Sequence, residues 1–168
     1  AFDPFEVSVR AIVGQQVSVK GATTIMGRIA SRYGLESKHG LIFPDASRLA
    51  DLQTEHLSMP TRRALTIKEL ARRVSIGELD FGIPDDDGFG EALLSIPGIG
   101  PWTAQYIALR ARGNPDAFLA GDLVIRKAAR SLLGMDREKE ILAHADNWRP
   151  WRGYAGMHLW RYAASLKR

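Results

Sequence analysis

The stretch that decides the fold spans residues 94–106 and reads LSIPGIGPWTAQY. Its centre is a run of prolines and glycines between two segments whose apolar residues recur at helical spacing. Glycine adopts left-handed backbone conformations without strain, so this run predicts a tight turn between two helices. Pro101 suits the first turn of the second helix, where its missing N–H has no partner to lose. We therefore expect a helical hairpin.

The turn of this hairpin is expected to bind an anion. Glycine turns and helix N-termini both leave backbone N–H groups unpaired, and together these groups form a positively polarised cup. A phosphate is the anion most often found in such a place. The cup would hold a phosphate without reading any base.

The composition sets limits on the class of protein. A length of 168 residues allows one domain or a tight pair of helical lobes with a substantial core. The net charge of +4 is compatible with a polyanionic partner but does not decide for one. The absence of cysteine excludes disulfides, thiol catalysis and a cysteine-ligated iron–sulfur cluster. No apolar run has membrane-spanning length and no signal-peptide pattern opens the chain, so we expect a soluble intracellular protein.

Helix signals recur from one end of the chain to the other. Asp3 and Ser18 are predicted to cap the first two helices, and Gly34 should end the second. Thr54 and Thr61 are candidate caps for the next two. Between the helices, a short strand or turn is expected at residues 41–44. The sequence therefore predicts an almost entirely helical chain.

One of these helices is unusually basic. It is expected over residues 62–76, with its positive side chains mostly away from the apolar side: Arg62, Arg63, Lys68, Arg72 and Arg73. Such a run is usually a solvated helix face. Contact with phosphate is the alternative.

Three further segments complete a recognisable pattern around the hairpin. They read RAIVGQQVSV at residues 10–19, WTAQYIALR at 102–110 and WRPWRGYAGMHLW at 148–160, and Asp122 follows a Gly-containing loop. In this order they resemble the 3-methyladenine DNA glycosylase II family within the helix-hairpin-helix-GPD superfamily. The match covers nearly the whole chain. It implies an all-α, two-lobed helical catalytic domain over residues 1–168, with a helix-hairpin-helix motif and without the family's N-terminal sheet domain.

The resemblance also implies an activity. Such enzymes flip an alkylated purine of the 3-methyladenine type out of duplex DNA and hydrolyse its N-glycosidic bond, which begins base-excision repair. Bifunctional relatives carry a nucleophilic Lys where this chain has Trp102, so we expect a monofunctional enzyme that leaves an abasic site. We also expect a monomer that acts in the cytoplasm on the nucleoid and needs no organic cofactor.

Three alternatives remain open at this stage. Helix-hairpin-helix modules also bind DNA without catalysis in many proteins. A related glycosylase could act on oxidised or deaminated bases instead. An interaction domain whose catalytic partner lies in sequence outside this chain is the third alternative.

Asp122 is the catalytic residue that the resemblance implies. Cleavage passes through a sugar with oxocarbenium character, and a carboxylate near C1′ stabilises the developing positive charge. A cationic alkylated purine leaves as a neutral base, so no second acid is required. Gly121 stands where the type enzyme of the family has another Asp, and we find no second acidic residue in a matching motif. An Asp in this place is otherwise a helix cap, and the two roles can coexist.

The remaining site residues are also implied by the resemblance. Trp102, Tyr106 and Trp160 would receive the extruded base, because aromatic faces attract cations, and Val124 would form part of the wall. Gln16 would fill the stack that the base has left. Singly, each aromatic is more often a core residue, and we assign Trp148, Trp151 and Tyr154 to the core.

The hairpin supplies the other expected contacts. Its DNA-binding residues would be Gly98, Ile99, Gly100 and Thr103, with Arg126 as a phosphate contact or a surface residue. In related hairpins, main-chain carbonyls bind a monovalent cation that bridges to a DNA phosphate. Here those carbonyls would be Leu94, Ile96 and Ile99, with Na⁺ or K⁺ as the ion. His158 has no ligand partner at metal spacing and is interpreted as structural.

Overall fold

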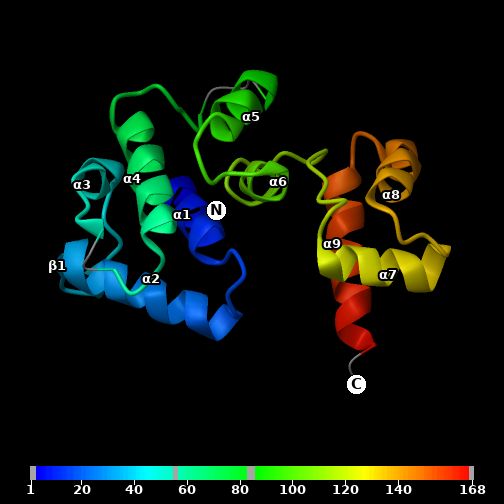
Figure 1. Cartoon of the computed structure of the whole chain (residues 1–168), viewed down its shortest axis with the longest axis horizontal. Coiled ribbons are helices and arrows are strands. Elements are labelled where there is room, and N and C mark those ends of the chain that lie inside the picture. The colour runs from blue at the N-terminus through cyan, green and yellow to red at the C-terminus, as the bar shows by residue number, and fades with distance from the viewer. Residues whose placement is uncertain (1–2, 55–56, 83–85, 167–168) are drawn as a thin grey trace.

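The computed structural model describes residues 3–54, 57–82 and 86–166, with only the backbone at residues 86–87. Helices make up nearly all of its regular structure, so the predicted all-α fold is confirmed. The helices gather into two lobes, each around its own hydrophobic core (Figure 1).

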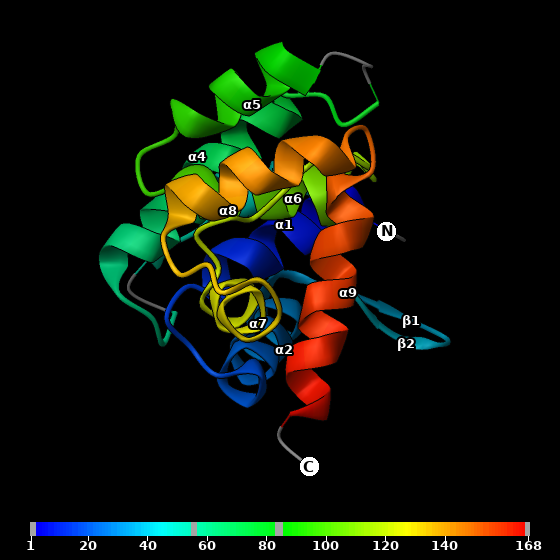
Figure 2. The same ribbon diagram turned by 90° about the vertical axis from the view of Figure 1, so that its right-hand side faces the viewer.

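The described part of the N-terminal lobe contains helices α1 to α6 and one small ribbon of two antiparallel strands. Its elements are α1 (Pro4–Val13), α2 (Val19–Tyr33), β1 (Leu35–Ser37), β2 (Gly40–Ile42), α3 (Ala46–Ala50), α4 (Thr61–Ser75), α5 (Asp86–Leu94) and α6 (Pro101–Arg110). The C-terminal lobe contains α7 (Leu123–Leu133), α8 (Glu138–Ala145), a single 3₁₀ turn (Asp146–Trp148) and α9 (Arg152–Ser165). In the turned view the β1–β2 ribbon projects from the side of the molecule (Figure 2).

The first helices begin where their capping residues predicted. The Asp3 carboxylate accepts the N–H groups of Phe5 at 2.8 Å and Glu6 at 3.2 Å. Ser18 Oγ accepts the N–H of Gly21 at 3.1 Å. Both predicted caps are therefore confirmed, and the Ser18 cap fixes the start of α2 at its corner with α1.

The start of α4 corrects one prediction. Thr61 is the first helical residue and Pro60 holds the cap position, so Thr61 is not the cap. Its backbone is already helical, so Thr61 belongs to the first turn of α4 and not to the cap position. The helix expected after Thr54 would begin at residues 55–56, which lie outside the described residues. The short strand predicted at residues 41–44 exists in part, as β2.

Helix α6 connects the two lobes. Ile107 belongs to the core of the N-terminal lobe and Leu109 to that of the C-terminal lobe, while Tyr106 packs against both. The chain then crosses through residues 111–122 to α7, which α9 crosses in turn (Figures 1 and 2). Any site between the lobes is therefore built around α6 and the start of α7.

The connection before α7 is held down by α9. Arg152 donates to both carboxylate oxygens of Asp116 at 2.8 Å, and its side chain is only 13% exposed. Gly153 N donates to the carbonyl of Pro115 at 2.7 Å. A Cβ on Gly153 would meet that same carbonyl oxygen at 2.8 Å, so only glycine allows this close approach. These bonds fix the loop that delivers Asp122.

Two of the aromatics assigned to the core lie on the surface instead. Trp151 is 58% exposed and Tyr154 is 51% exposed, and the two rings make an edge contact at 5.8 Å. The opposite face of α9, with Gly153 and Gly156, is the one that packs inward, which explains the error. Trp148 is half-buried against Phe118, as expected of a residue at a core margin.

None of the helices in the described part of the chain combines the length and the apolarity that a bilayer crossing requires.

Candidate active site

The hairpin turn has the predicted form. The N–H of Ile99 donates to the carbonyl of Ile96 at 3.0 Å and closes the turn. Gly98 has φ of +97°, and a Cβ there would lie 2.2 Å from Thr66 Oγ1 of α4. Gly100 holds the cap position of α6 and has no side chain with which to bind the first N–H groups of that helix. These amides are therefore left for an external acceptor.

The corner between α1 and α2 is tied directly to this turn. Gln15 Nε2 donates to the carbonyl of Gly98 at 3.0 Å and to Thr103 Oγ1 at 2.9 Å. Arg63 of α4 donates to the carbonyl of Gln15 at 2.6 Å. Gln15 thus joins two segments that are far apart in the sequence, a role that no local pattern indicated.

Gln16 is held in an unusual conformation beside the hairpin. Its φ is +56°, which costs a residue other than glycine on the order of 1 kcal/mol or more unless its surroundings fix it. Its neighbour Gln15 is anchored on both sides, so the surroundings do fix it. The side chain is exposed and lines the same hollow as Gly98 and Arg62. The structure therefore brings Gln16 and the hairpin turn to one face.

Asp122 is the N-cap of α7, and its carboxylate is surrounded by donors. Oδ1 accepts the N–H groups of Val124 at 2.9 Å and Ile125 at 3.0 Å. The indole Nε1 of Trp160 also donates to Oδ1, at 3.0 Å, whereas Nε1 of Trp102 donates to Oδ2 at 2.9 Å. Hydrogen bonds to a charged acceptor are strong and fix its orientation. Oδ2, with one donor against three on Oδ1, is the oxygen with room for a further partner.

The three aromatic side chains expected at the pocket do lie together. Trp102 and Tyr106 stack at 5.2 Å with an angle of 22° between their planes. Tyr106 and Trp160 meet at 6.4 Å in a tilted arrangement. The rings of Trp102 and Trp160 are also bound through their indole N–H groups to Asp122, so the carboxylate sets their orientation. The prediction from sequence was that the faces of these rings receive the base. The hydrogen bonds from the indole N–H groups to Asp122 were not predicted.

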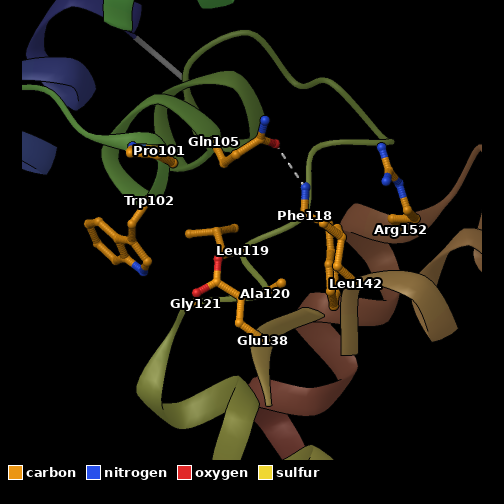
Figure 3. A pocket seen from close by; sticks show the side chains of 10 residues that line it. All are labelled: Pro101, Trp102, Gln105, Phe118, Leu119, Ala120, Gly121, Glu138, Leu142 and Arg152. Atoms are coloured by element: carbon orange, nitrogen blue, oxygen red, sulfur yellow. Dashed lines mark hydrogen bonds between the residues drawn. The ribbon is translucent and has the colours of Figure 1, made fainter. Parts of the chain in front are cut away.

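Trp102 lines two cavities. With Tyr106 it lines a cavity of about 220 Å³ against the α1–α2 corner, with Gly14 and Ala22 in its wall. It also lines a cavity of about 440 Å³ that reaches Gln105 and Glu138 (Figure 3). Asp122 lines neither cavity and is connected to them through its hydrogen bond with the Trp102 indole.

The other predicted residues take varied places. Val124 lies 40% exposed in the first turn of α7, next to the carboxylate. Arg126 donates to the carbonyl of Asp136 at 3.0 Å and so clasps the loop after α7. Thr103 is buried and its hydroxyl accepts from Gln15, so a DNA contact at this residue would come from its backbone. Ile99 is likewise buried and offers only backbone groups.

One of the three main-chain carbonyls predicted to bind a cation already accepts a hydrogen bond. The carbonyl of Ile96 already accepts the N–H of Ile99, and a carbonyl oxygen keeps a second lone pair after one such bond. Within the described residues, no group of three or more His, Asp or Glu side chains is placed to hold a metal ion. His158 lies exposed on α9.

Known DNA repair proteins are similar in sequence to this chain. The chain matches the HhH-GPD superfamily of base excision DNA repair proteins over residues 9–152. It is 37% identical over 165 residues to DNA-3-methyladenine glycosylase 2 of Escherichia coli, covering 94% of this chain and 57% of that one. It is 41% identical to a probable bifunctional transcriptional activator/DNA repair enzyme AlkA of Mycobacterium tuberculosis, again over 94% of this chain but 33% of the relative. The chain thus spans about a third to somewhat over half of the length of these curated relatives.

Solved structures agree in fold. A DNA-3-methyladenine glycosidase of Bacillus halodurans superimposes with a TM-score of 0.81 at 28% identity, over 98% of this chain and 77% of that chain. A 3-methyladenine DNA glycosylase of Schizosaccharomyces pombe, in complex with abasic DNA, gives 0.79 at 26% identity, over 95% of this chain and 80% of that one. These matches confirm the resemblance drawn from the motifs. The chain belongs to the HhH-GPD superfamily of base excision DNA repair proteins.

Proposed function

We propose that the chain is the catalytic domain of a monofunctional DNA glycosylase that hydrolyses the N-glycosidic bond of alkylated purines in duplex DNA. The observation that carries this proposal is the Asp122 carboxylate, held by two indole N–H groups at the edge of an aromatic cluster. The relatives from Escherichia coli and Bacillus subtilis are DNA-3-methyladenine glycosylases, which supports the same function. A non-catalytic clamp would need neither the carboxylate nor the ring cluster.

The chemistry assigned to Asp122 is electrostatic. As the bond from C1′ to the base lengthens, positive charge develops on the sugar, and Oδ2 is the oxygen available to stabilise it. Oδ1 stays bound to two backbone amides and one indole, so the carboxylate does not turn away. The same carboxylate can orient the attacking water. A cationic base departs neutral and takes no proton from the protein.

Recognition of the damaged base is assigned to the rings. An aromatic face attracts a cationic base by roughly 0.5–2 kcal/mol more than a neutral one. Trp102 and Tyr106 are already stacked on each other, and Trp160 closes the cluster from α9. Selectivity of this kind responds to the charge of the base and not to the position of one methyl group.

DNA binding is assigned to the face that carries the hairpin turn. The free amides around Gly98 and Gly100 would hold a backbone phosphate, and Gln16 would enter the stack. As part of the same proposal, the carbonyls of Leu94, Ile96 and Ile99 would hold Na⁺ or K⁺ beside that phosphate. The protein would act as a monomer in the cytoplasm, on nucleoid DNA.

The decisive experiment compares the wild type with Asp122→Asn on DNA methylated with a simple alkylating agent. Asn keeps the size of the side chain but removes its charge, so release of methylated purines should fall on the order of 10²–10³-fold or more. Binding to duplex DNA should remain within about threefold, because the hairpin is untouched. Release that persists in Asp122→Asn would remove the assignment of Asp122.

Two related measurements separate the alternatives. Wild-type protein that binds DNA but releases no base would be a clamp. Treatment with borohydride should trap no covalent adduct, because the residue at position 102 is Trp and not an amine nucleophile. A panel of duplexes with defined lesions would test the second candidate function, removal of deaminated bases, which is favoured by 27% identity to a thymine/uracil-DNA glycosylase of Pyrobaculum aerophilum.

A further inference from the structure

A second carboxylate lies beside the residue that precedes Asp122. Glu138 is the first residue of α8, and its side chain turns back toward the α6–α7 connection (Figure 3). A Cβ built on Gly121 would lie 3.1 Å from Glu138 Oε2, 3.2 Å from Cδ and 3.3 Å from Oε1. The carboxylate of Glu138 therefore lies in tight contact with the place that a side chain at position 121 would take.

Glu138 is exposed to solvent and lines a cavity whose wall combines polar and apolar side chains. This cavity, of about 440 Å³, also has Trp102, Leu119 and Leu142 in its wall. Trp102 also donates its indole N–H to Asp122 Oδ2, so one side chain both binds Asp122 and lines the cavity that Glu138 lines. A negative charge placed here acts on whatever positive group comes near that ring.

The charge of Glu138 is not neutralised within the described part of the chain, where no cation pairs with it. Arg152 lines the same cavity, but Asp116 holds its Nε and Nη2 groups. By contrast, Glu140 on the same helix is paired with Arg137. A glutamate at the first position of a helix stabilises the helix start in any orientation. That effect does not account for the direction that this side chain takes.

We propose that Glu138 is a specificity-determining residue, whose negative charge favours a cationic alkylated base over a neutral purine at the Trp102 cluster. This inference rests on the proposed function. A side chain at position 121 would push the Glu138 carboxylate from its present place by a few tenths of an ångström or more.

The test measures preference for charge separately from catalysis. In the Asp122→Asn background, equilibrium binding is compared for two duplexes of one sequence, one with 7-methylguanine and one with guanine at the same position. Adding Glu138→Gln should reduce the preference for the cationic base about three- to tenfold. Adding Glu140→Gln, the matched control on α8, should leave it within about twofold. An unchanged preference in Glu138→Gln, or an equal loss in Glu140→Gln, would overturn the inference.

A relocated carboxylate gives a second test that does not depend on one variant. Glu138→Ala should lose the preference, and Gly121→Asp combined with Glu138→Ala should restore most of it, because the new carboxylate enters the same space. Loss without recovery in the double variant would show that charge at this place is not the cause. Failure of the wild type to release methylated bases would instead overturn the proposed function, so the two failures are distinguishable.

Discussion

The starts of α6 and α7 share one backbone feature and use it in opposite ways. Both helices begin at the edge of the site with N–H groups that have no partner inside the helix. At α6 the cap position is Gly100, which leaves those groups open. At α7 the cap is Asp122, which takes up the N–H groups of Val124 and Ile125 itself. One helix start is thus available to an external anion, and the other presents an anion of its own.

The two helix starts therefore offer electrostatic environments of opposite sign. A phosphate suits the open start, and a developing sugar cation suits the start that carries a carboxylate. The two are linked by Trp102, which lies in the first turn of α6 and donates to the cap of α7. The open start of α6 and the carboxylate of Asp122 are therefore positioned by the same turn of helix.

The largest expected effect comes from Gly98→Ala, which disrupts the hairpin turn before α6. The new Cβ would lie 2.2 Å from Thr66 Oγ1, at a φ of +97° that disfavours any L side chain. Strain and overpacking together should lower the free energy of unfolding by about 2–4 kcal/mol. Urea unfolding monitored by circular dichroism measures this loss, and DNA binding should weaken as the turn deforms.

Gly100→Ala is the matched control within the same turn. A Cβ on Gly100 meets nothing within 4 Å and its φ is negative, so stability should change by about 0.5 kcal/mol or less. Thr66→Ala combined with Gly98→Ala should recover part of the loss, since it removes the collision and leaves the strain. Equal stability losses in Gly98→Ala and Gly100→Ala would contradict this account of the turn.

The next largest effect concerns the start of α7, where Asp122 is the cap. It distinguishes the contribution of the Trp102 indole from that of the Trp160 indole. Trp102→Phe removes the one indole donor to Oδ2, whereas Trp160→Phe leaves Oδ1 with two backbone donors. A hydrogen bond to a charged group contributes roughly 1.5–3 kcal/mol, so Trp102→Phe should slow base release about 10- to 100-fold. Trp160→Phe should slow it less, by about threefold to tenfold.

Single-turnover release from a 7-methylguanine duplex measures both variants. Duplex affinity should stay within about threefold in each, because phenylalanine retains a ring face and the hairpin amides are unchanged. Identical losses of rate in the two variants would mean that the rings act through stacking alone. A loss of affinity that matches the loss of rate would lead to the same conclusion.

The parts of this arrangement that could be predicted depend on local signals. A proline–glycine run at Pro97–Pro101 specifies its own turn, and Asp3 and Ser18 bind N–H groups within three residues of themselves. Such signals are complete within a short window of sequence. They predicted the hairpin and the starts of α1 and α2, whereas the grouping of the site residues was implied by the resemblance to the glycosylase family.

The parts that could not be predicted depend on partners far along the chain. Trp102 lies 20 residues from Asp122, and Trp160 lies 38 residues from it. Gln15 reaches Thr103 across 88 residues. The orientation of an indole edge or an amide is set by tertiary packing, which residue spacing does not encode. The same reason explains the error at Trp151, because several faces of the last helix carry aromatic residues.

The smallest expected effect concerns the ion pairs of α4 that support the hairpin turn before α6. Glu69 of α4 accepts from Arg72 and Arg73, and these hydrogen bonds lower the pKa of Glu69 from its ordinary 4.5 to about 2. Arg73 in turn donates to Ser95 Oγ at 2.7 Å, at the entrance to the hairpin. A carboxylate whose folded pKa is depressed stabilises the fold above its unfolded pKa, and this contribution is lost as the pH falls toward the folded value.

The stability advantage of the wild type over Glu69→Gln should therefore be complete near pH 6 and shrink between about pH 4.5 and 2. Urea midpoints measured across this range for both proteins give the difference directly. The Glu69 side chain is 30% exposed, so solvent screening keeps the difference small. Amide exchange should show that the hairpin is more affected than the start of α7, because Asp122 takes no part in this network. A difference that stays constant with pH would mean that the ion pairs do not support the turn.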